Sequence, residues 1–253
     1  MMEHRINNMK ILVEDNYDAM SKKAADLIGS YVNNSKELVL GLATGSTPIG
    51  TYKELVKAHE TCGLDFSAVT TFNLDEYYPI KKSNDQSYDY FMEEHLFSKI
   101  NIPCKNINIP NGEAKDYLKE CADYEAKIAA KGGLFVQLLG IGNNGHIGFN
   151  EPADEFVGPT HYVELDESTI KANARFFASE EEVPKHALTM GIKTIMSAKK
   201  IILVASGSGK AYIIYQTVFG PITPKNPASV LQLHQDVTII LDKEAGRLLL
   251  EKM

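Results

Sequence analysis

The sequence predicts an α/β fold: a single-domain, open, mostly parallel sheet with helices on both faces, of the Rossmann-like kind. Short apolar runs alternate with amphipathic segments along most of the chain, which is the rhythm of repeated strand–helix–strand units. The apolar run Leu134–Leu139 is typical of a parallel strand that is buried on both faces. No repeat, low-complexity tract or linker divides residues 1–253, so we expect one domain.

The first three predicted strands are short runs rich in apolar and β-branched residues. They are Met9–Val13, Glu37–Ala43 and Val69–Leu74. Asn16–Val32 is predicted to form a helix because its apolar residues recur every three to four positions. A second helix should begin in the turn TGSTP, with Thr47 as N-cap and Pro48 in the first helical position, and should run to about Thr61.

The same two patterns continue to the end of the chain. The other predicted strands are Asn106–Ile109, Leu134–Leu139, Lys200–Ala205 and Val237–Leu241. The other predicted helices are Ser87–Ile100, which Ser87 caps, and Ala114–Ala130, Pro184–Ala198, Gly209–Phe219 and Ala228–Leu233. Residues 151–185 lack periodicity and carry many charged and turn residues, so we expect a lid or a passive surface loop there. Residues 1–8 precede the first predicted strand, and we interpret them as an N-terminal extension or as the result of a misplaced start codon.

Composition excludes several classes of protein. With 26 Lys and Arg residues against 33 Asp and Glu, the net charge is −7, which argues against sequence-independent binding of nucleic acid. No apolar run approaches the roughly 18 residues of a membrane span, and the N-terminus lacks the apolar region of a secretory signal. The three cysteines lie far apart without metal-ligand spacing, so we expect reduced thiols, no metal site and a cytoplasmic location.

Two candidate sites follow predicted strands in the first half of the chain. The turn with Gly45, Ser46 and Thr47 leads into a helix, where backbone N–H groups can bind an anion. It matches neither nucleotide-binding motif GxxxxGK[ST] nor GxGxxG. Asp75 and Glu76 directly follow the third predicted strand, and a carboxylate in an apolar pocket can act as a general base. The alternatives are a plain strand–helix turn and a loop-capping aspartate.

Two further candidates lie in the second half. GIGNNGHIGFNEP, residues 140–152, is dense in Gly and Asn and places His146 and Glu151 five residues apart. A histidine with a carboxylate partner can transfer protons near neutral pH. Arg175, one of only three arginines, and Lys210, which opens a helix after a strand, together suit a dianion. The alternatives are a structural histidine and a solvated lysine.

The motifs together resemble one enzyme family. ATGSTP, NLDEYY, GNNGHIGFNEP, NARFF and GSGKA occur in the order found in the glucosamine-6-phosphate deaminase (isomerase) family, and the resemblance runs from about Met9 to Leu241. The string GHIGFNEP is the most specific. The related sugar-phosphate lactonases would be expected to carry a basic residue after the DE pair and a different string after the histidine.

The resemblance implies conversion of glucosamine 6-phosphate and water to fructose 6-phosphate and ammonia, in amino-sugar catabolism and without a cofactor. It implies that Asp75 moves the C2 proton, that His146 transfers the proton that opens the sugar ring, and that Glu151 orients His146. The residues implied to bind the phosphate are Gly45, Ser46, Thr47, Arg175 and Lys210.

The chain departs from the family pattern at two places. Many members have Asp at the position of Asn144, and an amide adds no negative charge beside His146. Allosterically activated hexameric members are expected to carry arginines after the position of Pro152, whereas this chain has no lysine or arginine before Lys171. We therefore expect no allosteric site for N-acetylglucosamine 6-phosphate. Both a monomer and a homo-oligomer fit the sequence.

Other functions on the same fold stay open at this point. The chain could instead be a lactonase of the 6-phosphogluconolactonase kind, or an isomerase of another amino-sugar phosphate such as galactosamine 6-phosphate. A non-catalytic sugar-phosphate sensor is the third alternative. A regulator of that kind should carry a basic helix-turn-helix segment, and the first predicted strand already begins at Met9.

Overall fold

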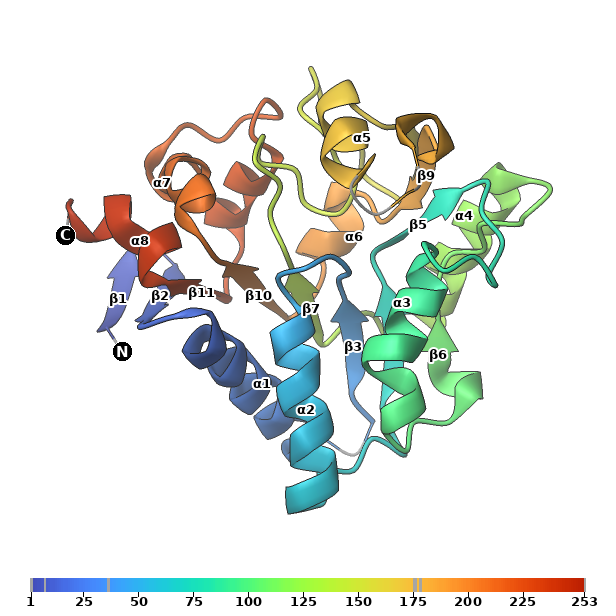
Figure 1. The fold of residues 1–253 in the computed structure, drawn as a ribbon, viewed down its shortest axis with the longest axis horizontal. Helices are drawn as coiled ribbons and strands as arrows, with labels where there is room; N and C mark the ends of the chain where they lie inside the picture. The colour runs from blue at the N-terminus through green and yellow to red at the C-terminus, as the bar shows by residue number, and fades with distance from the viewer. Residues whose placement is uncertain (1, 7, 36, 175–176, 178, 253) are drawn as a thin grey trace.

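The fold is organised around an eight-stranded, mostly parallel sheet, as predicted (Figure 1). The computed structural model describes residues 2–6, 8–35, 37–174, 177 and 179–252. Its strands are β1 (Met2–Ile6), β2 (Met9–Glu14), β3 (Val39–Leu42), β4 (Thr70–Asn73), β6 (Ile107–Asn108), β7 (Val136–Leu139), β10 (Lys200–Ala205) and β11 (Val237–Asp242). They lie in the order β1-β2-β11-β10-β7-β3-β4-β6, and only β1 pairs antiparallel with its neighbour. Residues 2–6, interpreted as part of an extension, thus form an edge strand of the sheet.

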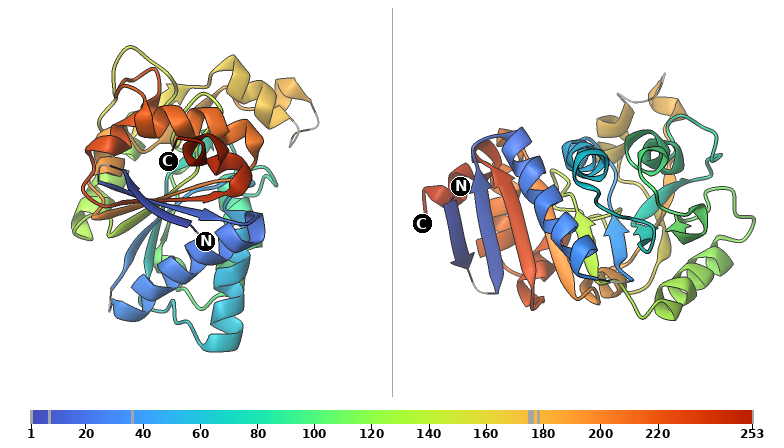
Figure 2. Two further views of the ribbon diagram at one scale, coloured as in Figure 1. Left: turned by 90° about the vertical axis from the view of Figure 1, so that its left-hand side faces the viewer. Right: turned by 90° about the horizontal axis from the view of Figure 1, so that it is seen from below.

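Helices cover both faces of this sheet (Figure 2). Those on one face are α1 (Tyr17–Asn34), α2 (Ile49–Cys62) and α3 (Tyr88–His95). Those on the other face are α4 (Tyr117–Ala130), α6 (Ile192–Met196), α7 (Ala211–Phe219) and α8 (Lys243–Leu250), with the 3-10 helix η6 (Pro227–Leu233). Each face packs its own apolar cluster, because the strands present side chains alternately to the two sides. Within the described ranges, none of the helices is both long and apolar enough to cross a membrane.

A second, three-stranded antiparallel sheet was not predicted. It consists of β5 (Asp75–Tyr78), β9 (His186–Thr189) and β8 (His161–Glu164), in that order. The predicted helix Pro184–Ala198 is therefore wrong: its first part is β9, and only Ile192–Met196 is helical. Between them, Gly191 packs so closely on the backbone of residues 158–159 that a Cβ atom would lie 2.2 Å from a carbonyl oxygen.

Several element boundaries also differ from the prediction. Thr47 is not an N-cap: Pro48 precedes α2, no side chain caps it, and the N–H group of Gly50 instead donates to the hydroxyl of Tyr17 at 2.8 Å. Ser87 caps α3 as predicted, but the helix ends before Leu96, and η1 (Phe97–Lys99) follows. Residues 151–185 contain β8 and the helix α5 (Glu167–Asn173), with η4 (Glu180–Glu182) after it. Two further 3-10 helices among the described residues are η2 (Cys104–Asn106) and η5 (Ser208–Lys210).

The strand order creates a switch point between β3 and β7. The chain adds β4 and β6 on one side of β3, then returns to place β7 on its other side and continues outward with β10 and β11. The loops that follow β3 and β7 therefore leave the sheet edge in opposite directions, which opens a crevice at the carboxyl ends of the strands. The topology thus selects one place for a ligand, between residues 43–48 and residues 140–146.

Candidate active site

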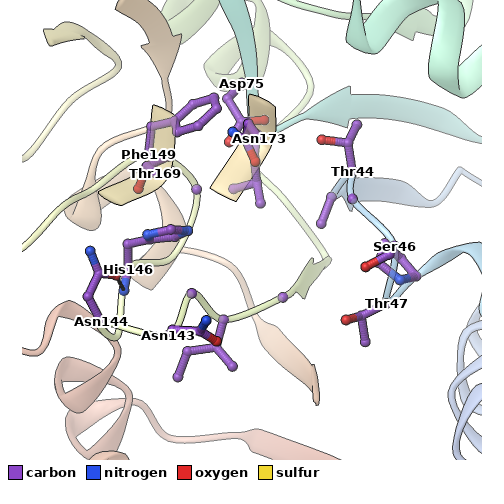
Figure 3. Close-up of a pocket in the computed structure, with 18 of the residues that line it drawn as sticks. Thr44, Ser46, Thr47, Asp75, Asn143, Asn144, His146, Phe149, Thr169 and Asn173 are labelled. Carbon is purple, nitrogen blue, oxygen red and sulfur yellow. Dashed lines mark hydrogen bonds between the residues drawn. The ribbon is translucent and has the colours of Figure 1, made fainter. Parts of the chain in front are cut away.

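A cavity of about 700 Å³ lies at this switch point (Figure 3). Its walls come from the turns after β3 and β7, the start of β5, helix α5 and the turn before α7. The predicted site residues that line it are Gly45, Ser46, Thr47, Asp75, Asn144, His146 and Lys210. Figure 3 shows Ser46 and Thr47 on one side of the cavity and Asn144 and His146 on the other. Residues that are far apart in the sequence are thus gathered around one space, as predicted.

Asp75 is the buried acid of the cavity. It begins β5, and only 6% of its surface is exposed. Burial raises the pKa of its carboxyl well above the usual range, and the negative charge of Glu76 raises it further. None of the described residues donates a hydrogen bond to its carboxylate. An acid without such donors, aimed at a cavity, is suited to accept a proton from carbon and return it.

Glu76, beside it in sequence, has a structural task. Its Oε1 atom accepts the backbone N–H groups of Tyr77 and Tyr88, both at 2.9 Å, and its Oε2 atom accepts that of Asp89 at 3.0 Å. Glu76 therefore caps the start of α3 from another element. Burial raises the pKa of Glu76 to about 7, although the three N–H donors oppose the rise. The capping role that was considered for Asp75 thus belongs to its neighbour.

His146 and Glu151 contact each other as predicted. Nδ1 of His146 lies 3.2 Å from Oε2 of Glu151, and the amide of Asn144 donates to the same oxygen at 2.8 Å. Oδ1 of Asn144 in turn accepts the backbone N–H group of His146 at 3.2 Å. Burial raises the pKa of Glu151, but the hydrogen bonds and charge of His146, with donors from Thr169 and Asn144, outweigh burial and lower it below its usual value. Glu151 is therefore a carboxylate that contacts the imidazole ring and is itself held by donors from Asn144 and Thr169.

The opposite wall offers donors for an anion. Gly45 adopts a positive φ of 99°, which a side chain would resist, and this lets the turn lead directly into α2. The hydroxyl of Tyr17 donates to the carbonyl groups of Ser46 and Thr47 at 3.2 and 3.1 Å and so braces the turn. Lys210 lines the same cavity, and its Nζ donates to the carbonyl of Ile141 at 2.7 Å. Arg175 lies outside the described residues.

Four contributors were not identified from the sequence. Tyr17 braces the anion turn, Thr169 donates to Glu151 at 2.5 Å, and Tyr88 and Asn173 line the cavity. Tyr17, Thr169 and Tyr88 lie in ordinary helical or cap patterns, which carry no signal of a functional role. Asn173 belongs to the NARFF motif and could have been named from the sequence. Throughout the part of the chain that the structure describes, no three His, Cys, Asp or Glu side chains are placed to hold a metal ion.

The pair Asn144 and Glu151 allows a test of charge beside His146. A carboxylate in place of the amide, introduced as Asn144→Asp, would add negative charge next to the imidazole ring and would stabilise its protonated form. We expect the acid limb of the pH–rate profile to move to higher pH, by about 0.5–1 unit. Steady-state rates between about pH 5 and pH 9 measure this. The charge argument is wrong if the limb stays in place.

Comparison with known proteins identifies the family of this chain. The family described as "Glucosamine-6-phosphate isomerases/6-phosphogluconolactonase" matches residues 13–240. Curated relatives named glucosamine-6-phosphate deaminase are 56% identical in Clostridioides difficile (strain 630) and 57% identical in Clostridium novyi (strain NT). Both alignments span 238 residues and 94% of this chain, with 96% and 99% of the respective relatives.

Solved structures show the same relationship. A monomeric glucosamine-6-phosphate deaminase superposes with a TM-score of 0.92 at 44% identity, covering 94% of this chain and 99% of that one. The 6-phosphogluconolactonase from Trypanosoma cruzi superposes with a TM-score of 0.76 at 21% identity, covering 96% and 98%. The likeness to the lactonase concerns the fold alone, whereas the monomeric deaminase also has the same amino acid as this chain at 44% of the aligned positions.

Proposed function

The chain belongs to the family of glucosamine-6-phosphate isomerases and 6-phosphogluconolactonases, and from this premise we propose that it is a glucosamine-6-phosphate deaminase. The reaction converts glucosamine 6-phosphate and water to fructose 6-phosphate and ammonia. One observation carries the proposal: a single cavity is lined by a buried acid with a raised pKa, by a histidine that contacts Glu151, by a helix-start turn and by a lysine. These are the groups that a ring-opening isomerisation of a sugar phosphate needs.

The chemistry divides between two of these groups. His146, held by Glu151, transfers the proton that accompanies opening of the ring to the free aldehyde. Asp75 removes the proton at C2 and returns it to C1, so that the C–H bond lost at C2 is regained at C1. The amine at C2 becomes an imine as one of its protons passes, in net terms, to the oxygen at C1, which becomes a hydroxyl. Water then adds to the imine, which releases ammonia and leaves the ketone. A base with a raised pKa is matched to this transfer because it holds the proton between the two steps.

The other wall would hold the phosphate. Backbone N–H groups of Gly45, Ser46 and Thr47 at the start of α2, and the ammonium of Lys210, supply donors and positive potential. We assign Arg175 to the same group from the NARFF motif. Holding a distant phosphate fixes C1 and C2 between Asp75 and His146, which converts binding energy into orientation.

The decisive experiment is an assay of purified protein on glucosamine 6-phosphate, with coupled detection of fructose 6-phosphate and of ammonia. We expect both products in equal amounts. Galactosamine 6-phosphate and 6-phosphogluconolactone are assayed in parallel, because turnover of either one in place of glucosamine 6-phosphate would establish another member of the family. If the protein binds glucosamine 6-phosphate and releases no ammonia, it is a sensor.

We also propose that N-acetylglucosamine 6-phosphate does not activate this enzyme. The segment between Pro152 and Lys171 has no lysine or arginine to bind a second phosphate there. The expected rate curve against glucosamine 6-phosphate is hyperbolic and is unchanged by the N-acetylated sugar, apart from competition at the cavity. A sigmoidal curve that the effector converts to a hyperbola would contradict this prediction.

A further inference from the structure

The structure assigns Thr169 as a positioning residue that joins helix α5 to the His146–Glu151 pair. This inference deepens the proposed function and rests on it. Thr169 lies in helix α5, whose last residue, Asn173, begins the NARFF motif, and 5% of the surface of Thr169 is exposed. Its hydroxyl donates to Oε1 of Glu151 at 2.5 Å, a short bond to a charged acceptor.

Glu151 acts as a bridge because its two oxygens serve different partners. Oε1 accepts from Thr169 of α5, whereas Oε2 accepts from Asn144 and contacts Nδ1 of His146. A carboxylate held at both oxygens cannot turn about its terminal bond. The position of α5 therefore sets the plane of the carboxylate, and that plane sets the orientation of the imidazole ring.

Helix α5 is fastened at its other end as well. The amide of Asn173 donates to the hydroxyl of Tyr77 at 2.9 Å, and Tyr77 packs on Tyr88 and Phe149 beside the cavity. Thr169 and Asn173 both line the cavity, one turn apart on the helix (Figure 3). Helix α5 is thus held at the wall of the cavity by two side-chain hydrogen bonds, one from Thr169 and one from Asn173.

The test removes the hydroxyl and keeps the shape. In Thr169→Val, Glu151 loses a donor that lowers its pKa, while Asn144 and the titratable group facing it, His146, remain. We expect kcat to fall by about 10-fold or more, with KM changed less than about 3-fold. We also expect the acid limb of the pH–rate profile to move to higher pH, because Glu151 then takes up a proton more readily. Thr169→Ser restores the hydroxyl and should restore both properties.

The chain offers a matched control. Thr194 is also 5% exposed and also donates from its hydroxyl to a glutamate, Oε1 of Glu125, at 2.6 Å, but it does not line the cavity. Thr194→Val should lower Tm by a few degrees and leave kcat and its pH profile unchanged. A Thr169→Val variant that behaves like this control would show that Thr169 is only structural, and would overturn the inference.

A second background separates coupling from general damage. The variant Glu151→Gln already lacks the carboxylate that joins Thr169 to His146. Adding Thr169→Val to this variant should therefore lower kcat by less than about 2-fold relative to Glu151→Gln alone. A full loss of about 10-fold in this background would also overturn the inference, because Thr169 would then act without Glu151. Absence of ammonia release by the unmodified protein would instead refute the proposed function. The two failures are therefore distinguishable.

Discussion

Replacing Asp75 by Asn is expected to abolish turnover while leaving a folded protein that still binds glucosamine 6-phosphate. The amide has the size of the carboxylate but cannot accept the C2 proton, so we expect kcat to fall by about 10³-fold or more. The turn at residues 45–47 and Lys210 are untouched, so calorimetric affinity for the substrate should change by less than about 3-fold. Retained turnover would remove Asp75 from the role of base.

The same variant should be more stable than the unmodified protein above about pH 4. The pKa of Asp75 is raised in the folded protein, so the folded state holds a proton that the unfolded state releases at about pH 4. Stability contributed by this group is present below that pH and is lost as pH rises toward the folded pKa. The Asn variant does not undergo this loss, and we expect its Tm to be higher by roughly 2–8 °C at about pH 8.

The pH dependence distinguishes this cause from others. The gain in Tm should be small at about pH 4 and should grow with pH, as measured by thermal unfolding up to about pH 8. The pKa of Glu76 is also raised, to about 7, so the stability that Glu76 contributes falls with rising pH as well. Because both proteins contain Glu76, this loss is the same in each and does not affect the comparison. Asp18→Asn, at an exposed aspartate of α1, is the control and should show no such trend. A gain that is independent of pH would point to packing and not to charge.

The sequence predicted the sheet well because its strands are locally apolar and its helices are periodic. The run Lys200–Ala205 matches β10 at both ends, and Ser87 caps α3 as expected. Hydrophobic pattern and capping chemistry act within a few residues, so they can be read without knowing the fold. The alternation of strands and helices also predicted that ligands bind at the carboxyl ends of the parallel strands. The candidate residues that line the cavity do lie together at that edge of the sheet.

The second sheet could not be predicted in this way. The segments of β5, β8 and β9 are four residues each, and β5 pairs with a strand far along the chain, so no local pattern distinguishes them from turns or a helix end. The hydrogen bonds of Tyr17 and Thr169 could not be predicted for the same reason, since each joins two segments that are separated in the sequence. Local sequence therefore indicated which residues carry the chemistry, and tertiary contacts supply the residues that hold them in place.

Gly142→Ala is expected to reduce turnover strongly without unfolding the protein. A Cβ atom at this position would lie 2.3–2.5 Å from three atoms of the His146 ring, which is far closer than side chains approach. The ring is the far end of a side chain, so it should swing away from its contact with Glu151 while the backbone stays in place. Displacing a proton-transfer group by about 1 Å lowers kcat on the order of 10²-fold, while Tm should fall by only a few degrees.

Gly140→Ala is a matched control in the same turn, two residues earlier. Gly140 also lines the cavity, but a Cβ atom there meets no protein atom within 4 Å, so the same methyl group should leave the His146 ring in place and should lower kcat less than Gly142→Ala does. Comparing the two variants separates the effect of a displaced imidazole ring from the effect of stiffening a glycine-rich turn. Equal losses in both variants would assign the glycines to backbone freedom. A loss confined to position 142 would show that the turn is shaped around the ring of His146.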